Sequence, residues 1–324
     1  MLALSWGFSW LRDYDSDRRR FAAEIAALRS DFKILLKTQN EAALLRKWIE
    51  HHIKIVGRSG ILIFDHGSTD ADVERVYQDY ADTIMVFRYR GFHNIIHHRG
   101  CHPELYAALE SSCRYYQFLD TDEFLVRTDG KNFVSDSSIV DSICRNEDVK
   151  LSPGVWLHNI MGYTDRFELS VNLHTLIAGL KWGKPILASS LASSEIQMHN
   201  MQVFEKHRET SLLTNFMLLH KNMVSPSQRI NANLRKLVAY KVIPSVADLQ
   251  AVLDMSPDDH EVETCRRFIK EVHDLSKLPA DMMGNTGRSV RFQEDGQMIF
   301  ENPENKQIFE TFVENPDPAW VGWQ

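Results

Sequence analysis

Short apolar runs and helix-like segments alternate along the first 125 residues of the chain. The runs are apolar throughout rather than at every second position, which indicates strands buried on both faces. The segments between them repeat leucine, isoleucine and tryptophan at helical spacing, most clearly over residues 40–56. This order predicts an α/β fold, a mostly parallel, Rossmann-like sheet with helices on both faces. Strands are expected over residues 32–37, 61–64, 83–87 and 115–119, and helices over 13–31, 40–56, 69–80 and 103–113.

The pattern changes after residue 126. A predicted helix over 136–145 leads to shorter strands rich in Trp, Gly and Ser between 149 and 204. Further helices are expected after Pro226, and the tail from Glu301 is predicted to be loosely ordered. We therefore expect an N-terminal segment and helix (1–30), a central domain (31–225, with halves 31–125 and 126–225) and a C-terminal helical extension and tail (226–324).

Composition and charge narrow the class of protein. The chain has 324 residues, of which 44% are hydrophobic and 25% charged, as in ordinary globular proteins. Its net charge of −7 gives no general attraction for a polyanion, so nucleic acid is not an expected partner. Residues 2–11 are apolar but too few to span a bilayer, and they lack the basic start of a secretory signal. The expected location is cytoplasmic, with peripheral membrane contact left open. The cysteines are scattered, with neither disulfide-scaffold nor zinc spacing: Cys101, Cys113, Cys144 and Cys265.

The strongest candidate chemistry follows the fourth strand, in the sequence F-L-D-T-D-E-F (residues 118–124). Ligands bind beyond the carboxyl ends of the strands in parallel sheets. Asp120 and Asp122 are two residues apart in an extended segment and are expected to point the same way. Such a pair suits Mg²⁺ or Mn²⁺ bound together with substrate phosphates. The plainer interpretation is a polar turn that caps a following helix.

Two other strand ends carry polar residues. A turn with a helix cap explains Gly67 to Asp70, but it leaves Asp65 free to accept hydrogen bonds from a nucleobase or ribose. After the first strand, Thr38 and Glu41 are expected to line the same crevice, with Asn40 as a helix N-cap.

Four motifs in this order resemble one enzyme family. K-T-Q-N-E (37–41), W-I-E-H-H (48–52), I-F-D-H-G-S-T-D (63–70) and F-L-D-T-D-E-F together resemble the family 2-like glycosyltransferases of GT-A fold, including the branch that resembles family 92. The resemblance covers residues 32–125, with Gln39 and His66 as departures. It implies that Asp65 lies at the donor nucleotide and that Asp120 and Asp122 hold the metal on the donor diphosphate. It also assigns residues 31–125 to nucleotide binding and 126–225 to the acceptor.

The activity implied is metal-dependent transfer of a sugar from a nucleoside-diphosphate sugar, UDP-linked by expectation, to a glycan or lipid-linked acceptor with inversion. Mn²⁺ or Mg²⁺ would neutralise the charge that develops on the leaving diphosphate. Inversion also needs a base for the acceptor hydroxyl. The candidates are Asp165, Glu168, Glu195 and Glu205, with Asp165 favoured because it follows the apolar run that ends at Ile160.

Basic residues complete the predicted site. By the resemblance, His97 or Arg99 contacts phosphate and His220 is the third metal ligand, with His199 a weaker candidate. The family segment H-Y-x-x-K-S is similar to residues 220–225, although Lys221 and Val224 depart from it. Lys184 is a candidate cation for the diphosphate, and a basic surface loop is the simpler interpretation.

Two alternatives to this function stay open. Asp120-Thr121-Asp122 also resembles the nucleophile and acid of haloacid-dehalogenase-type phosphohydrolases, although those place the motif after the first strand. A catalytically silent, sugar-binding protein of GT-A fold would keep the motifs without turnover.

Overall fold

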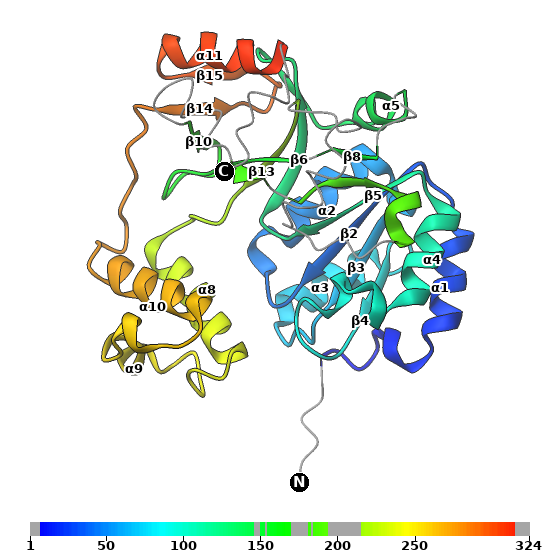
Figure 1. Cartoon of the computed structure of the whole chain (residues 1–324), viewed down its shortest axis with the longest axis horizontal. Helices are drawn as coiled ribbons and strands as arrows, with labels where there is room; N and C mark the ends of the chain where they lie inside the picture. The colour runs from blue at the N-terminus through cyan, green and yellow to red at the C-terminus, as the bar shows by residue number, and fades with distance from the viewer. Residues whose placement is uncertain are drawn as a thin grey trace.

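Seven strands form the central sheet of the protein, in the order β1-β4-β3-β2-β5-β12-β8 (Figure 1). The computed structural model describes residues 7–145, 150–152, 154–169, 181–182, 184–193 and 215–314. The pairs from β1 to β5 are parallel, and β12 pairs antiparallel with both β5 and β8. The strands are β1 (Arg12–Asp13), β2 (Phe32–Thr38), β3 (Ile61–Asp65), β4 (Met85–Arg88), β5 (Tyr115–Asp120), β8 (Leu151–Ser152) and β12 (Ile186–Ala188).

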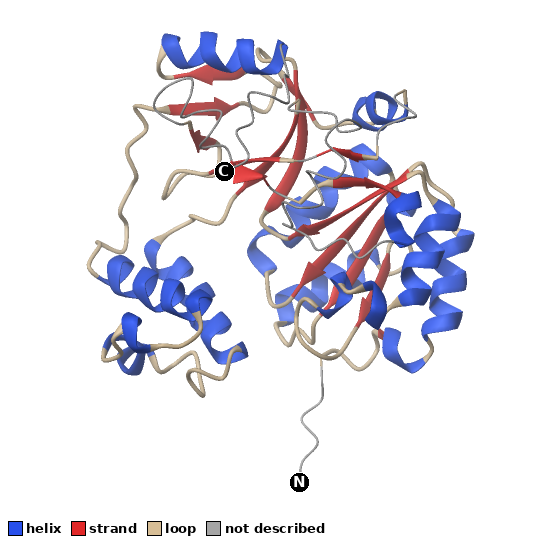
Figure 2. Cartoon of the chain, in the orientation of Figure 1, coloured by secondary structure: helices blue, strands red, loops and turns tan. Residues whose placement is uncertain are grey.

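Helices cover both faces of this sheet (Figure 2). Ile34 and Leu36 of β2 pack in the core cluster that contains α2 (Ala42–Val56) and α3 (Ala71–Tyr80). Leu35, between them, packs on the opposite face with α1 (Arg18–Ala27) and α4 (Pro103–Ser112). The strands are apolar throughout because helices cover both faces of the sheet, as the sequence indicated. The predicted α/β class with a mostly parallel sheet is confirmed.

Local capping agrees with the prediction at one strand end and differs at the other. Asp70, within the predicted turn with a helix cap, caps α3 through the backbone N–H of Asp72. Asn40 is not the N-cap of α2, which is Glu41. With φ at 54°, Asn40 accepts hydrogen bonds from the backbone N–H groups of Thr69 and Asp70 at 2.8 and 3.1 Å. It thus ties together the loops that follow β2 and β3.

A second, five-stranded sheet begins directly after β5. Its order is β11-β9-β13-β6-β7, and β13 runs antiparallel to β6 and parallel to β9. Residues 121 and 122 are therefore the turn that joins the two sheets, and the interpretation of a polar turn before a helix is wrong. The strands are β6 (Glu123–Thr128), β7 (Phe133–Val134), β9 (Val155–His158), β11 (Lys181–Trp182) and β13 (Phe216–His220), and helix α5 (Ser138–Cys144) follows β7.

The C-terminal region is only partly a helical extension. Helices α8 (Pro226–Ala239), α9 (Leu249–Leu253) and α10 (Glu263–Ser276) enclose a core of their own around Leu237 and Phe268. The chain then returns to the main body (Figure 1), where β10 (Arg166–Glu168), β14 (Ser289–Phe292) and β15 (Met298–Phe300) form a third sheet.

The prediction of a loosely ordered tail from Glu301 is wrong for residues 303–314, which form helix α11 (Pro303–Glu314). Phe309 of this helix is 1% exposed and joins the main core.

At the other end of the chain, Phe8 and Leu11, from the apolar run noted in the sequence, are buried in the main core. Residues 1–6 lie outside the described part of the chain. Within that part, no helix combines the length and the apolar character needed to cross a membrane.

Candidate active site

The turn between the two sheets, residues 121 and 122, follows the carboxyl end of β5, which lies beside β2, and β2 in turn lies beside β3. Strand register places Lys37 beside Asp120 and Thr38 beside Asp65. The hydroxyl of Thr121 donates to that of Thr38 at 2.7 Å. Three of the predicted strand-end positions are thus neighbours, as parallel strands require.

Two buried lysines hold Asp120. The ammonium group of Lys37 lies 3.2 Å from one carboxylate oxygen, and that of Lys184 contacts the other. Both lysine side chains are at most 5% exposed. Burial alone would raise the pKa of Asp120, but the charges of Lys184 and Lys37 hold it well below its ordinary value. Asp120 is therefore an ionised carboxylate already neutralised by protein cations.

Glu123 fixes the conformation of the turn. One of its oxygens accepts hydrogen bonds from Lys184 Nζ and from the backbone N–H of Asp120, each at 2.8 Å. The other accepts from Trp156 Nε1 at 2.8 Å. Burial raises the pKa of the Glu123 carboxyl, whereas the two carboxylates overcome burial to raise the pKa of Lys184. Lys184 is thus a buried bridge between Asp120 and Glu123, and the surface-loop interpretation of this lysine is wrong.

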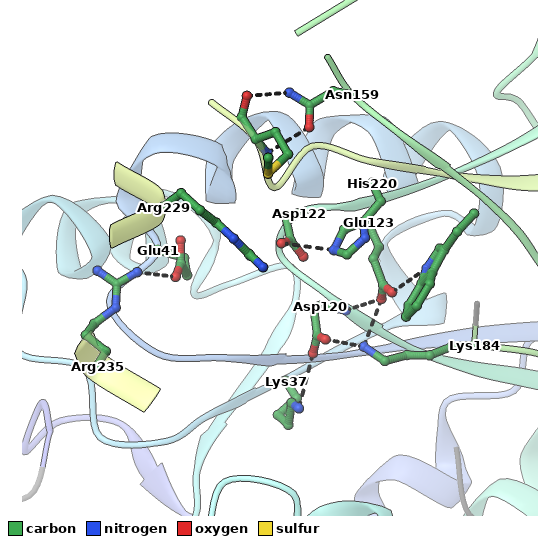
Figure 3. A network of polar contacts seen from close by, with 12 residues as sticks. Lys37, Glu41, Asp120, Asp122, Glu123, Asn159, Lys184, His220, Arg229 and Arg235 are labelled. Atoms are coloured by element: carbon green, nitrogen blue, oxygen red, sulfur yellow. Dashed lines mark hydrogen bonds and ion pairs between the residues drawn. The ribbon is translucent and has the colours of Figure 1, made fainter. Parts of the chain in front are cut away.

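Asp122 faces a different partner. Its Oδ2 lies 3.2 Å from Nε2 of His220, the last residue of β13. Trp156 stacks on the His220 ring, with centroids 4.9 Å apart. Burial opposes ionisation of both groups, but the partner's charge and the hydrogen bond between the two side chains together outweigh it, so the pKa of His220 is raised and that of Asp122 is lowered. Figure 3 shows Asp120 and Asp122 turned to separate partners, so the predicted convergence of the two carboxylates does not occur.

Two of the three predicted metal ligands fit a divalent cation. Two ligands that are each about 2.1 Å from one octahedral ion lie about 3 Å apart, close to the separation of Asp122 and His220. Asp120 does not fit, because both of its oxygens face ammonium groups. Among the residues that the structure describes, no three His, Cys, Asp or Glu side chains are grouped to hold a metal. The donor set present is one carboxylate and one imidazole.

The Asp122–His220 pair makes stability depend on pH. Because the pKa of His220 is raised in the folded protein, its charge stabilises the fold fully below the pKa of the unfolded chain, about 6.5. This stabilisation is lost as the pH rises through the pKa of the folded state. The lowered pKa of Asp122 means that its contribution is full above about 3.9 and is lost at lower pH. We expect His220→Gln to cost about 1 kcal/mol more unfolding free energy at pH 6 than at pH 8.5. Urea unfolding measures this, with His98→Gln, at an exposed histidine, as control, and an equal cost at both pH values would contradict it.

Asp65 is fully engaged inside the protein. One oxygen accepts the Ser68 backbone N–H at 2.6 Å, and the other accepts the hydroxyls of Ser68 and Tyr77 at 2.5 and 2.8 Å. The side chain is buried. Its visible role is therefore to hold the loop after β3, and its predicted contact with a nucleotide stays a prediction.

His97 and Arg99 occupy different surroundings. The His97 ring packs edge-on against Phe118, and burial followed by the charge of Lys37 keeps its pKa well below the ordinary value. It is a neutral imidazole close enough to Asp120 to feel its charge. Arg99 acts electrostatically on Tyr106 and Tyr116, on the α4 side of the sheet. The structure brings only His97 of this pair to the turn.

Two of the candidate bases, Asp165 and Glu168, lie in the small third sheet or next to it. Asp165 pairs with Arg291, whose Nε is 3.1 Å away, and its carbonyl accepts from Phe292 N at 2.8 Å. Burial, followed by the charge of Lys47, lowers the pKa of Lys221, the residue after His220, and the charge of Asp165 only partly opposes this. Glu168 is exposed at the end of β10. The other candidates, Glu195 and Glu205, lie outside the described residues, as does His199.

The sequence interpretation missed Lys37, Glu123 and Trp156. Lys37 had a signal, because it is one of two lysines in a strand that is otherwise largely apolar, and a buried charge is costly unless it is paired. Glu123 and Trp156 had none, because their pairing depends on β13 lying between β6 and β9 in the second sheet, an order that no local pattern indicates.

No protein-family model and no curated protein matches the chain. Solved structures match it at low identity. The Staphylococcus aureus TarS fragment 1–349 is 11% identical, with 76% of this chain and 71% of that chain covered and a TM-score of 0.32. Glucosyl-3-phosphoglycerate synthase from Mycobacterium tuberculosis, in complex with Mn²⁺ and UDP-glucose, is 13% identical, with coverages of 86% and 90% and a TM-score of 0.37. A cytidylyltransferase from Leptospira borgpetersenii is 12% identical, with coverages of 72% and 98% and a TM-score of 0.34. Similarities this weak carry no functional argument, so function rests on the residues of this chain.

Proposed function

We propose that the protein is a GT-A-type glycosyltransferase that transfers a sugar from a UDP-sugar to a hydroxyl of a glycan or lipid-linked acceptor, with inversion and with Mn²⁺ or Mg²⁺. One observation carries the proposal. Asp122 and His220 meet beside two buried lysines, at the carboxyl ends of parallel strands, where α/β proteins bind nucleotides. The cytoplasmic location and peripheral membrane contact stay predictions from the sequence.

Charge at the turn suits a diphosphate. Asp120 and Glu123 are balanced by Lys37 and Lys184, so this part of the site is close to neutral before any ligand binds. A divalent cation on Asp122 and a neutral His220 then leaves a net positive charge, which favours an anionic ligand.

The roles of the residues follow from these contacts. Asp122 and His220 would hold the metal ion, which supplies charge neutralisation for the leaving diphosphate. Glu123 and Lys184 keep the turn in one conformation, so that Asp122 needs no rearrangement when ligand binds. Asp165 is the proposed base for the acceptor hydroxyl, with Glu168 the second candidate, because both lie on the β9–β10 side of the site, beyond His220.

Titration calorimetry with UDP tests the proposal. We expect UDP to bind at least about 10-fold more tightly with Mn²⁺ or Mg²⁺ than with a chelator, as expected when ligand and protein share a metal. Incubation with UDP-glucose and other UDP-sugars should release UDP in the presence of an acceptor pool.

Three other outcomes would contradict the proposal. Equal binding with and without the metal would remove the role of Asp122 and His220. Hydrolysis of an aryl phosphate that is lost in Asp120→Asn would favour the phosphohydrolase alternative. Nucleotide-sugar binding without turnover on any acceptor would favour the silent GT-A alternative.

A further inference from the structure

Two adjacent histidines of helix α2, His51 and His52, bind the backbone of one residue in the second sheet. Nε2 of His51 lies 2.7 Å from the carbonyl oxygen of Leu125, and the backbone N–H of Leu125 donates to Nε2 of His52 at 3.3 Å. Both histidines belong to the W-I-E-H-H motif (48–52), to which the proposed function gives no role. Leu125 is the third residue of β6, the strand that begins directly after Asp122. The histidines therefore join a helix that packs on the first sheet to a strand of the second (Figure 1).

These bonds are made on the edge of β6 that faces away from β13. The N–H of Lys221 donates to the carbonyl of Asp122 at 2.7 Å, and the N–H of Thr128 donates to the carbonyl of Asn215 at 2.8 Å. Hydrogen-bonded positions alternate along an antiparallel pair, so the N–H and the C=O of Leu125 point away from β13. On that outer edge, the described pairing of β7 covers only the last two residues of β6. At Leu125 the two imidazoles thus take the place of a neighbouring strand.

The hydrogen bonds determine which nitrogen of each ring carries the proton. A carbonyl oxygen can only accept, so His51 is protonated on Nε2. Nδ1 of His52 lies 2.9 Å from the carbonyl oxygen of Trp48 and must donate to it, which leaves Nε2 as the acceptor for Leu125. Burial lowers the pKa of His51 to about 4 and keeps the pKa of His52 well below its ordinary value, so both rings are neutral at pH 7. One donor and one acceptor therefore match the two backbone groups of a single residue.

The ring of Phe124, the preceding residue of β6, connects the two histidines to the candidate site. Its centre lies 5.3 and 6.1 Å from the centres of the two imidazole rings. Lys221 Nζ lies 4.5 Å from the same ring centre. Lys221 follows His220 directly, and its backbone N–H is the one that donates to Asp122. A shift of β6 would therefore be passed on both to Asp122, which precedes the strand, and to His220.

On the basis of the proposed function, we propose that His51 and His52 are positioning residues: they fix the direction in which β6 leaves the turn and so hold Asp122 and His220 at the separation that a shared metal ion requires. Neither histidine touches the metal or a substrate. Without them, the two backbone groups of Leu125 lose their partners, and β6 becomes free to shift where no strand of the described sheet supports it.

The variants that test this differ in hydrogen bonding at one ring. His52→Phe keeps an aromatic ring beside Phe124 but cannot accept the N–H of Leu125, whereas His52→Gln places an amide oxygen near the position of Nε2. We expect His52→Phe to weaken Mn²⁺-dependent UDP binding about 10-fold in calorimetry, and His52→Gln to bind UDP within about 3-fold of the unchanged protein. His51→Phe, which removes only the bond to the carbonyl, should have the same effect to a smaller extent and serves if His52→Phe does not fold.

The matched control is His273→Phe. Its Nε2 lies 2.9 Å from the carbonyl oxygen of Val252, so the variant also removes a bond between a histidine and the backbone, but next to the separate core of α8 to α10. UDP binding should not change in this variant.

Amide hydrogen exchange of the ligand-free protein separates positioning from a general loss of stability. In His52→Phe we expect faster exchange at residues 121–126 and 220–222 and unchanged exchange in β2 and β3. Exchange that rises equally in all strands, or no more at the turn than in His273→Phe, would overturn the proposal, as would unchanged UDP binding in both His52→Phe and His51→Phe. If UDP binding does not depend on a metal even in the unchanged protein, the proposed function fails, and exchange at the turn still decides whether the two histidines hold it in place.

Discussion

Replacing Lys184 with methionine is expected to lower the free energy of unfolding by about 3 to 5 kcal/mol. The substitution leaves the carboxylates of Asp120 and Glu123 close together, with Glu123 fully buried and without its cation. Breaking a buried ion pair by removing one partner is costly for this reason, whatever the pair itself contributes. Urea unfolding of the purified variant measures the change.

Lys33→Met is the matched control for this experiment. Lys33, which lies in β2, is buried like Lys184. Its ammonium group donates to the carbonyl of Leu28 and has no carboxylate partner among the described ion pairs. Its loss should cost clearly less. Adding Glu123→Gln to the Lys184→Met variant should recover part of the stability, since it removes one uncompensated charge. Equal costs for Lys184→Met and Lys33→Met would show that the two carboxylates do not depend on Lys184.

Asp122→Asn is expected to reduce the UDP affinity measured with Mn²⁺ to the level measured with a chelator, and to slow sugar transfer about 100-fold or more. An amide oxygen keeps the shape of the side chain but removes the charge that a divalent cation needs, and it also weakens the hold on His220. Calorimetry with and without metal gives the first effect, and UDP release from the UDP-sugar gives the second.

Two further variants make the second experiment specific. Asp82→Asn, at an exposed aspartate before β4, should leave both quantities unchanged. Asp165→Asn should keep metal-dependent UDP binding and lower only the turnover rate if Asp165 is the base. Metal-dependent UDP binding that survives in Asp122→Asn would contradict the assignment of this residue.

Much of the fold could be predicted because local pattern determines it. The strands β2, β3 and β5 are continuous apolar runs, and both of their faces are covered, so periodicity alone indicates where they lie. The same pattern shows where β5 ends. The position of the candidate site then follows because parallel sheets bind ligands beyond the carboxyl ends of their strands.

Partners distant in sequence could not be predicted. Asp120 and Asp122 were expected to converge because alternate residues of one strand share a face, but the chain passes from one sheet to another between them. Lys184, which decides the surroundings of Asp120, lies 61 residues beyond Glu123. Asp65 shows the same limit. The sequence indicated no partner for its carboxylate, but the hydroxyl of Tyr77 on α3 donates a hydrogen bond to it.

The return of the chain to the main body after α10 has a practical consequence for dissecting the protein. Val290, Phe292 and Phe309, which follow the helical segment, fill the same core as the strands that precede it. A shortened chain that stops after α10 would lack β14, the strand that pairs with β10. Apolar side chains of the core would then be exposed to water. Dissection therefore has to excise α8 to α10 from within, with a linker joining the flanking ends, because the C-terminal segment is a structural part of the first half.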